Sequence, residues 1–151
     1  MDCEMVRTDR GSELGRITVL TSSGAVFFDR LVQPRVAIVD YNSRYSGLTA
    51  EVLEGVTVTL QEVQARLLGF LAAEDIVVGH GLRDDMMAMH LEHRRLVDTS
   101  YVFPHPEGRP KKLSLRNLSK THLDRTIQNL ESGHDSREDA LAALDLMKSH
   151  P

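Results

Sequence analysis

Two carboxylates stand two positions apart at the start of the chain, Asp2 and Glu4. In an extended strand, residues i and i+2 point to the same face, so these side chains should project together while Cys3 and Met5 turn into the core. Neighbouring anions repel each other unless a cation lies between them. Oxygen ligands without thiolate or imidazole favour Mg²⁺ or Mn²⁺. The pair therefore indicates a metal site, with a solvated strand face as the alternative explanation.

A second acidic pair, Asp84 and Asp85, follows a short apolar run at 76–79. The run predicts a buried strand that ends at a glycine, and a helix is predicted over 83–91. Ligands of open α/β sheets gather where strands end in this way. Adjacent helical residues cannot both face one site, so at most one of the two aspartates would serve it. Alternatively, both stabilise the positive N-terminus of the helix.

A third group combines an imidazole with a carboxylate near the start of the last predicted helix. His134 follows Gly133 in a loop, and Asp139 lies five residues later, in the first turn of a helix that Ser136 can cap. The carboxylate can bind metal, and the imidazole can take a proton from water. The alternative is a capping box formed by Ser136 and Asp139 beside a solvent-exposed histidine.

The elements that must position these groups alternate between strands and helices. Runs at 15–21 and 26–31 predict a hairpin, and 33–46 is predicted to be a surface loop. Thr49 can cap a short helix, and Thr59 with Glu62 forms a capping box for a longer one. The other predicted elements are a helix at 50–53, a strand at 96–99, a loop at 103–112, a helix from 113 and a last helix ending near Ser149. Such alternation predicts an α/β layer fold with an antiparallel hairpin on one side.

Composition is that of an ordinary globular domain. The chain has 151 residues, of which 41% are hydrophobic and 26% charged, so one domain over 1–151 is expected. No apolar run reaches membrane-spanning length, and no signal peptide is recognisable. A single cysteine favours a reducing, intracellular compartment. The net charge of −4 does not exclude a nucleic-acid partner, because two divalent cations on four carboxylates would neutralise it.

Together, the three groups resemble the motifs of the DEDDh 3′-5′ exonucleases, the DnaQ-like enzymes. Within that family they are most similar to the RNA exonuclease branch of the Rex enzymes and their interferon-induced relatives. The motifs lie at 2–6, 79–85 and 133–139, and further similarity lies at 38–49, 113–118 and 127–129. The resemblance implies a ribonuclease H-like fold with a mixed five-strand sheet flanked by helices. Family members carry several apolar residues before the first aspartate, whereas only Met1 precedes it here, so we expect a truncated first strand in a possible fragment of a longer protein.

The resemblance also implies roles for individual residues. His134 would be the general base, and Asp85 is preferred to Asp84 because it lies five residues after His80. The implied metal ligands, for two divalent cations (Mg²⁺ or Mn²⁺), are Asp2, Glu4, Asp85 and Asp139. The implied substrate-binding residues are Cys3, Met5, Arg44 and His80.

The activity implied by the resemblance is hydrolysis of single-stranded RNA from a free 3′-hydroxyl, releasing nucleoside 5′-monophosphates. A DNA exonuclease and a catalytically impaired nucleic-acid-binding fragment are the alternatives. The nucleus, nucleolus or cytoplasm would be its compartment, with flanking domains or protein partners outside this chain. The basic side chains that could steer a strand, or simply be solvated, are Arg35, Arg44, Arg109, Lys111, Lys112, Arg116 and Lys120.

Overall fold

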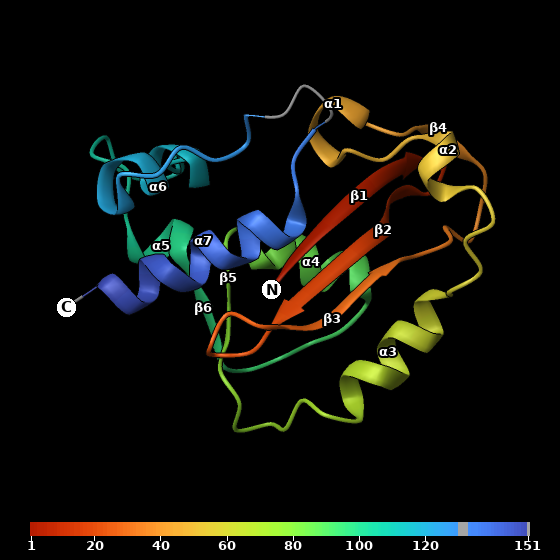
Figure 1. The fold of residues 1–151 in the computed structure, drawn as a ribbon, viewed down its shortest axis with the longest axis horizontal. Coiled ribbons are helices and arrows are strands. Elements are labelled where there is room, and N and C mark those ends of the chain that lie inside the picture. Colours follow the sequence, from red (N-terminus) through yellow and green to blue (C-terminus); the bar gives the residue numbers. More distant parts are fainter. Residues whose placement is uncertain (130–132, 151) are drawn as a thin grey trace.

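The computed structural model describes residues 1–129 and 133–150 and contains two sheets with helices around them (Figure 1). The four-stranded antiparallel sheet has the order β3-β2-β1-β4, and β5 and β6 form a parallel pair. The β2–β3 hairpin agrees with the sequence prediction. The strands are β1 (Asp2–Thr8), β2 (Gly11–Leu20), β3 (Val26–Leu31), β4 (Ile38–Asp40), β5 (Val77–Gly79) and β6 (Leu96–Asp98).

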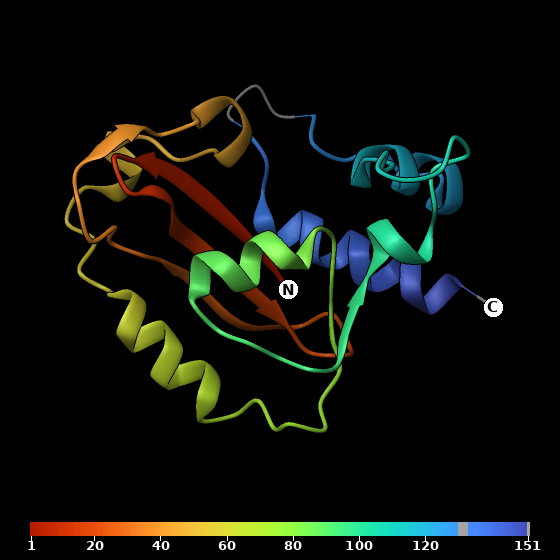
Figure 2. The same cartoon turned by 180° about the vertical axis from the view of Figure 1, so that it is seen from behind.

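Helices lie on both sides of the large sheet. The longest helix, α7, packs on β2 and is nearest the viewer in Figure 1, whereas α4 lies in front of β1 when the molecule is turned round (Figure 2). The helices are α1 (Ser43–Ser46), α2 (Ala50–Leu53), α3 (Leu60–Leu68), α4 (Leu82–Met89), α5 (Thr99–Val102), α6 (Leu115–Leu123) and α7 (Ser136–Ser149). None of them, within the described residues, is long and apolar enough to cross a membrane.

Burial of apolar side chains ties these layers together. The main core joins the sheet to α3 and α4 and includes Cys3, Ile17, Val63 and Met89. A second cluster joins α6 to α7 through residues such as Leu118. Burial of large aliphatic side chains contributes about 1.5–3 kcal/mol each, so these contacts hold α3 and α4 against the sheet and α6 against α7.

The expected single mixed sheet of five strands is instead two sheets of four and two strands. β5 runs beside only the first residue of the chain, where the Met1 ammonium donates a hydrogen bond to Val78 O at 2.7 Å. The approach is tight, since a Cβ on Gly79 would lie 2.7 Å from Met1 O. A single hydrogen bond does not make β1 and β5 a pair of hydrogen-bonded strands, so β5 and β6 form a sheet separate from the four-stranded one. On its other side, all seven residues of β1 pair with β2.

Two local predictions were wrong. The stretch 33–46 is not wholly loop: it contains α1, and it contains β4, which pairs with Arg7 and Thr8 at the end of β1. The last helix is capped by Asp135 rather than Ser136, because the Asp135 carboxylate accepts from Arg137 N at 3.1 Å. The Ser136 hydroxyl points inward to Thr18 Oγ1, 2.7 Å away. The caps at Thr49 and Thr59, with the Glu62 capping box, are confirmed.

Candidate active site

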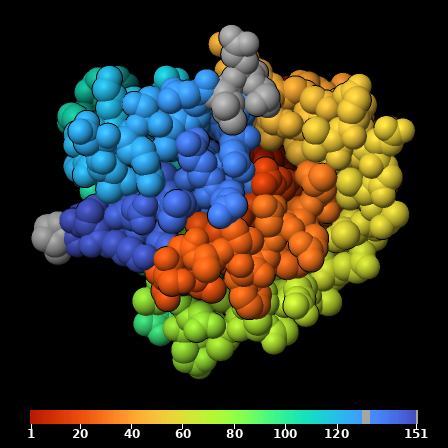
Figure 3. All heavy atoms as spheres, in the orientation of Figure 1, coloured from red at the N-terminus to blue at the C-terminus, as the bar shows by residue number. Residues whose placement is uncertain are grey.

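Three of the predicted carboxylates meet where the start of β1 faces the first turn of α7. One oxygen each from Asp2, Glu4 and Asp139 lies within 4.8 Å of the other two. Glu4 and Asp139 are buried, and Asp2 is partly exposed. In Figure 3 the red atoms of the first residues lie in a hollow bordered by blue and orange segments of the chain. The strand alternation that aligns Asp2 with Glu4 thus works together with a helix from the other end of the sequence.

Asp85 belongs to the same region, although it is not one of the three nearest groups. It lies in the first turn of α4 and is buried, whereas Asp84 is exposed. After burial, the charge of Asp85 is the largest influence that raises the pKa of Asp2. This is the orientation expected of Asp85 rather than Asp84.

The start of α4 is held by Asp98, a residue that the sequence did not single out. Its carboxylate accepts from Gly81 N at 2.9 Å and from Leu82 N at 3.1 Å. Gly81 itself has a left-handed backbone and no side chain with which to cap the helix. Asp98 at the end of β6 therefore supplies the cap from the neighbouring strand and fixes the turn that carries Asp85.

The carboxylates lie in an environment that disfavours their charged forms, because they are largely removed from water. Burial raises the pKa of Glu4 to about 8, that of Asp85 to about 7 and that of Asp139 to about 6. Among the described residues, Glu4 Oε1, Asp85 Oδ2 and Asp139 Oδ1 are buried without a hydrogen-bond partner. Buried polar atoms normally have partners, and a hard divalent cation is the partner that carboxylate oxygens suit. The residues present therefore fit Mg²⁺ or Mn²⁺.

His134 is placed beside this group by a close backbone contact. Gly133 has a φ of +102°, and a Cβ there would lie 2.3 Å from Gly47 N. The next residue, His134, donates its backbone N–H to Tyr45 O at 2.8 Å, and its Nδ1 lies 3.7 Å from Asp139 Oδ2. Burial, followed by the charge of Arg116, lowers the pKa of His134. The imidazole is therefore neutral near pH 7, as a general base must be.

Gln128 orients Asp139, and sequence reasoning did not find this contact. Its side-chain amide donates to Asp139 Oδ2 at 2.8 Å, while its backbone N–H donates to Glu138 Oε2, also at 2.8 Å. Gln128 adopts a left-handed backbone with a φ of 58°. Because Oδ2 is held, Oδ1 remains the oxygen available to a cation. The only signal in the sequence was the family-like stretch 127–129, which carried no information about contacts.

Arg16 is a second unpredicted neighbour of the site. It stands opposite Glu4 in the β1–β2 ladder and binds both oxygens of Asp29, at 3.0 and 2.9 Å. Its remaining guanidinium nitrogen donates to Asp135 Oδ1 at 3.1 Å. The start of α7 is thereby tied to β2, and the Arg16 charge partly offsets the burial of Glu4.

The four predicted substrate-binding residues lie in different environments. Cys3 is buried in the main core, so only its backbone could meet a substrate, and Met5 is partly buried. Arg44 is exposed on α1, with its guanidinium 5.8 Å from the Tyr45 ring centre, and that ring meets His134 edge-on at 5.9 Å. His80 is partly buried and its Nδ1 lies 2.8 Å from Thr99 Oγ1.

Comparison with known proteins bears on the fold of the chain. No family model matches the chain. RNA exonuclease 1 of Saccharomyces cerevisiae is 46% identical over 149 residues, which are 98% of this chain and 27% of that protein. The catalytic unit of Neurospora crassa Pan2, with its protease and nuclease domains, superposes with a TM-score of 0.86 at 28% identity, over 98% of this chain and 26% of that one. The chain has a ribonuclease H-like nuclease fold.

A further structure extends the comparison to one with nucleic acid bound. The pseudoubiquitin hydrolase-RNA exonuclease module of Saccharomyces cerevisiae Pan2, solved with A7 RNA, matches with a TM-score of 0.85 at 28% identity, over 98% of this chain and 27% of that one. The chain spans between 12% and 27% of the length of the curated exonucleases that it matches. These similarities confirm the predicted fold class.

Proposed function

We propose that this chain is a 3′-to-5′ exoribonuclease domain of the DEDDh type. It hydrolyses single-stranded RNA from a free 3′-hydroxyl and releases nucleoside 5′-monophosphates. The observation that carries the proposal is the cluster of buried carboxylates, three of which have a buried oxygen with no hydrogen-bond partner in the described structure. The similarity to proteins named RNA exonuclease supports RNA as the substrate class.

Asp2, Glu4, Asp85 and Asp139 would hold two divalent cations, Mg²⁺ or Mn²⁺. When bound, the cations supply positive charge that neutralises the phosphodiester and stabilises the attacking and leaving oxygens. The protein contributes the arrangement of the ligands: β1 aligns two of them, Asp98 fixes the turn that carries Asp85, and Gln128 turns Asp139. Without positive charge the four carboxylates would repel the phosphate.

His134 would act as the general base. Its neutral imidazole takes a proton from the attacking water, which displaces the 3′-oxygen of the preceding nucleotide in line. The hydrogen bond from His134 N to Tyr45 O and the edge-on contact of the two rings limit the positions that the imidazole can adopt. Gln128 already occupies Asp139 Oδ2, which leaves the imidazole 3.7 Å away and free of a tight ion pair.

The test is digestion of an RNA labelled at its 5′ end, together with a circular RNA of the same sequence. We expect Mg²⁺-dependent shortening of the linear RNA from its 3′ end, with 5′-monophosphates as the only small products. The circular RNA should persist. Internal cuts in the circle, or products with 3′-phosphates, would refute the proposed direction and chemistry.

A further inference from the structure

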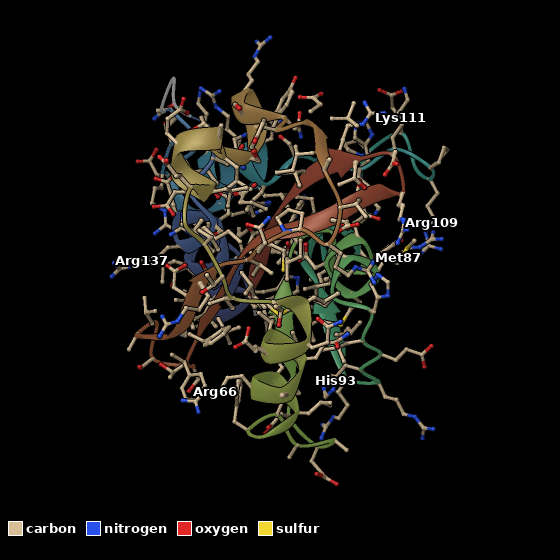
Figure 4. The ribbon with its side chains drawn as sticks, turned by 90° about the vertical axis from the view of Figure 1, so that its right-hand side faces the viewer. Arg66, Met87, His93, Arg109, Lys111 and Arg137 are labelled. Carbon is tan, nitrogen blue, oxygen red and sulfur yellow. The ribbon has the colours of Figure 1, made fainter. Side chains whose placement is uncertain are left out.

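Two basic side chains gather around one exposed tyrosine at the edge of the molecule. The segment after α5 folds back, closed by a bridge between Pro104 and Lys112, and brings two basic side chains beside Tyr101. The Arg109 guanidinium lies 5.3 Å from the Tyr101 ring centre, and Lys112 Nζ lies 4.3 Å from it. All three residues are exposed. Figure 4 shows Arg109 and Lys111 at the upper right of the molecule, above Met87 of α4.

These two cations are oriented but not neutralised. Within residues 1–129 and 133–150, neither Arg109 nor Lys112 lies within ion-pair distance of a carboxylate. Lys111, between them in the sequence, is paired with Glu107. A tyrosine ring attracts a cation while leaving its charge in place, so Tyr101 preorganises two positive groups that still lack an anion.

The cluster is connected to the candidate active site through the end of β6 and the His80 ring. Tyr101 follows Asp98 and Thr99, which hold the start of α4 and the His80 ring. The His80 pKa is lowered, first by burial, and the Lys112 charge also lowers it against the opposing effect of Asp98. Tyr101 further lines a groove of about 1630 Å³ along α4 and β6. Leu82 and Asp84 at the start of α4 line this groove, but none of the four candidate metal ligands does, so the link from Asp85 to the cluster runs through the turn at 80–82 and Asp98.

We propose that Tyr101, Arg109 and Lys112 form a phosphate clamp for the part of the nucleic-acid strand upstream of the reacting 3′ end. The inference rests on the proposed exonuclease function and extends it to longer substrates. A guanidinium suits bidentate contact with a phosphate, and an ammonium adds a point charge. Because phosphates are common to RNA and DNA, the clamp contributes affinity without reading the sugar or the base.

The clamp should make binding dependent on strand length and on salt. Each phosphate contact to a single strand contributes about 0.7 to the slope of log Kd against log salt concentration. Loss of both cations should therefore reduce that slope by about 1.4. A trinucleotide, which reaches only the carboxylate site, should be unaffected.

The experiment compares Arg109→Gln/Lys112→Gln with the wild type and with Lys111→Gln, the matched control whose lysine is already paired. We expect the double variant to lose roughly tenfold or more in kcat/KM on long single-stranded RNA, and to keep its kcat/KM on the trinucleotide. Tyr101→Phe should behave as the wild type, because the ring is retained, whereas Tyr101→Ala should lose affinity for long strands. Lys111→Gln should change little.

Equal losses on long and short substrates, or the same loss in Lys111→Gln, would overturn the clamp. An acidic peptide that competes as well as a long strand would also overturn it, in favour of a protein partner. The salt slope is measured by binding alone, in EDTA, so it decides the clamp even if the chain hydrolyses nothing. Hydrolysis of the trinucleotide by every variant would preserve the exonuclease proposal while the clamp stands or falls separately.

Discussion

Raising the pH should destabilise the metal-free protein between about pH 6.5 and pH 8. Glu4 has a pKa of about 8 in the folded protein, against an ordinary value of 4.5, so the folded state keeps a proton that the unfolded state has lost. Stability is therefore greatest below the ordinary pKa and falls as the pH approaches 8. The lowered pKa values of His80 and His134 act in the opposite direction near pH 6.5, because the unfolded state still binds part of a proton at each of these imidazoles.

The size of the effect follows from the number of protons retained. One proton is worth about 1.4 kcal/mol for each pH unit, which gives about 2 kcal/mol across this interval. The raised pKa values of Asp2 and Asp85 add to the fall, whereas the lowered pKa values of the Met1 ammonium, His80 and His134 oppose it, so we take one net proton as the total. For a chain of this length, 2 kcal/mol corresponds to about 4–8 °C in Tm.

Thermal unfolding followed by circular dichroism in EDTA would measure this change. Glu4→Gln should flatten the pH dependence, whereas Glu62→Gln should preserve it, because Glu62 is exposed in a capping box and its pKa is lowered. Saturating Mg²⁺ should also remove the fall, since a cation replaces the retained proton. A Tm in EDTA that stays level or rises from pH 6.5 to pH 8 would refute the electrostatic account of the site.

Three substitutions test individual roles. Asp139→Asn should abolish turnover while the metal-free Tm holds or rises, because anionic repulsion is relieved; a large fall in Tm would make Asp139 mainly a structural residue. Gln128→Leu should raise the Mg²⁺ concentration for half-maximal activity by about 10–100-fold, as loss of a ligand-orienting hydrogen bond does; unchanged Mg²⁺ dependence would contradict the orienting role. Arg44→Ala should lower kcat/KM on RNA about 10–100-fold more than on matched DNA if it contacts the ribose hydroxyl. Parallel declines on the two substrates would assign Arg44 to a phosphate instead.

The sequence was most informative where a short periodic pattern met a buried face. The two-residue alternation at the start of the chain correctly placed Asp2 beside Glu4 and Cys3 in the core. Burial also distinguishes Asp85 from Asp84, as adjacent residues on a helix must differ in direction. The meeting of Asp139 with residues of β1, far away in the sequence, was expected only from the resemblance to a family, because no local pattern encodes it.

Single long-range contacts escaped prediction for the same physical reason. Asp98 at the end of β6 caps α4, a helix that follows a different strand, β5. Gln128 reaches Asp139 from a turn that has no periodic sequence pattern. β4 has three residues, too few to show an alternation. The cap at Asp135 could not be chosen over Ser136 from sequence, since both side chains are good caps and only the tertiary contact of Ser136 with Thr18 decides between them.

Hydrolysis is proposed to depend on cations that the buried carboxylates bind. The most direct measurement is a Mg²⁺ titration in which calorimetric binding and RNA hydrolysis are recorded on the same preparation, with Asp139→Asn alongside the wild type. We predict that binding heat and 3′-end hydrolysis appear over the same Mg²⁺ range and that the variant loses both. Full hydrolysis by the wild type in excess chelator, or undiminished hydrolysis by Asp139→Asn, would contradict the account.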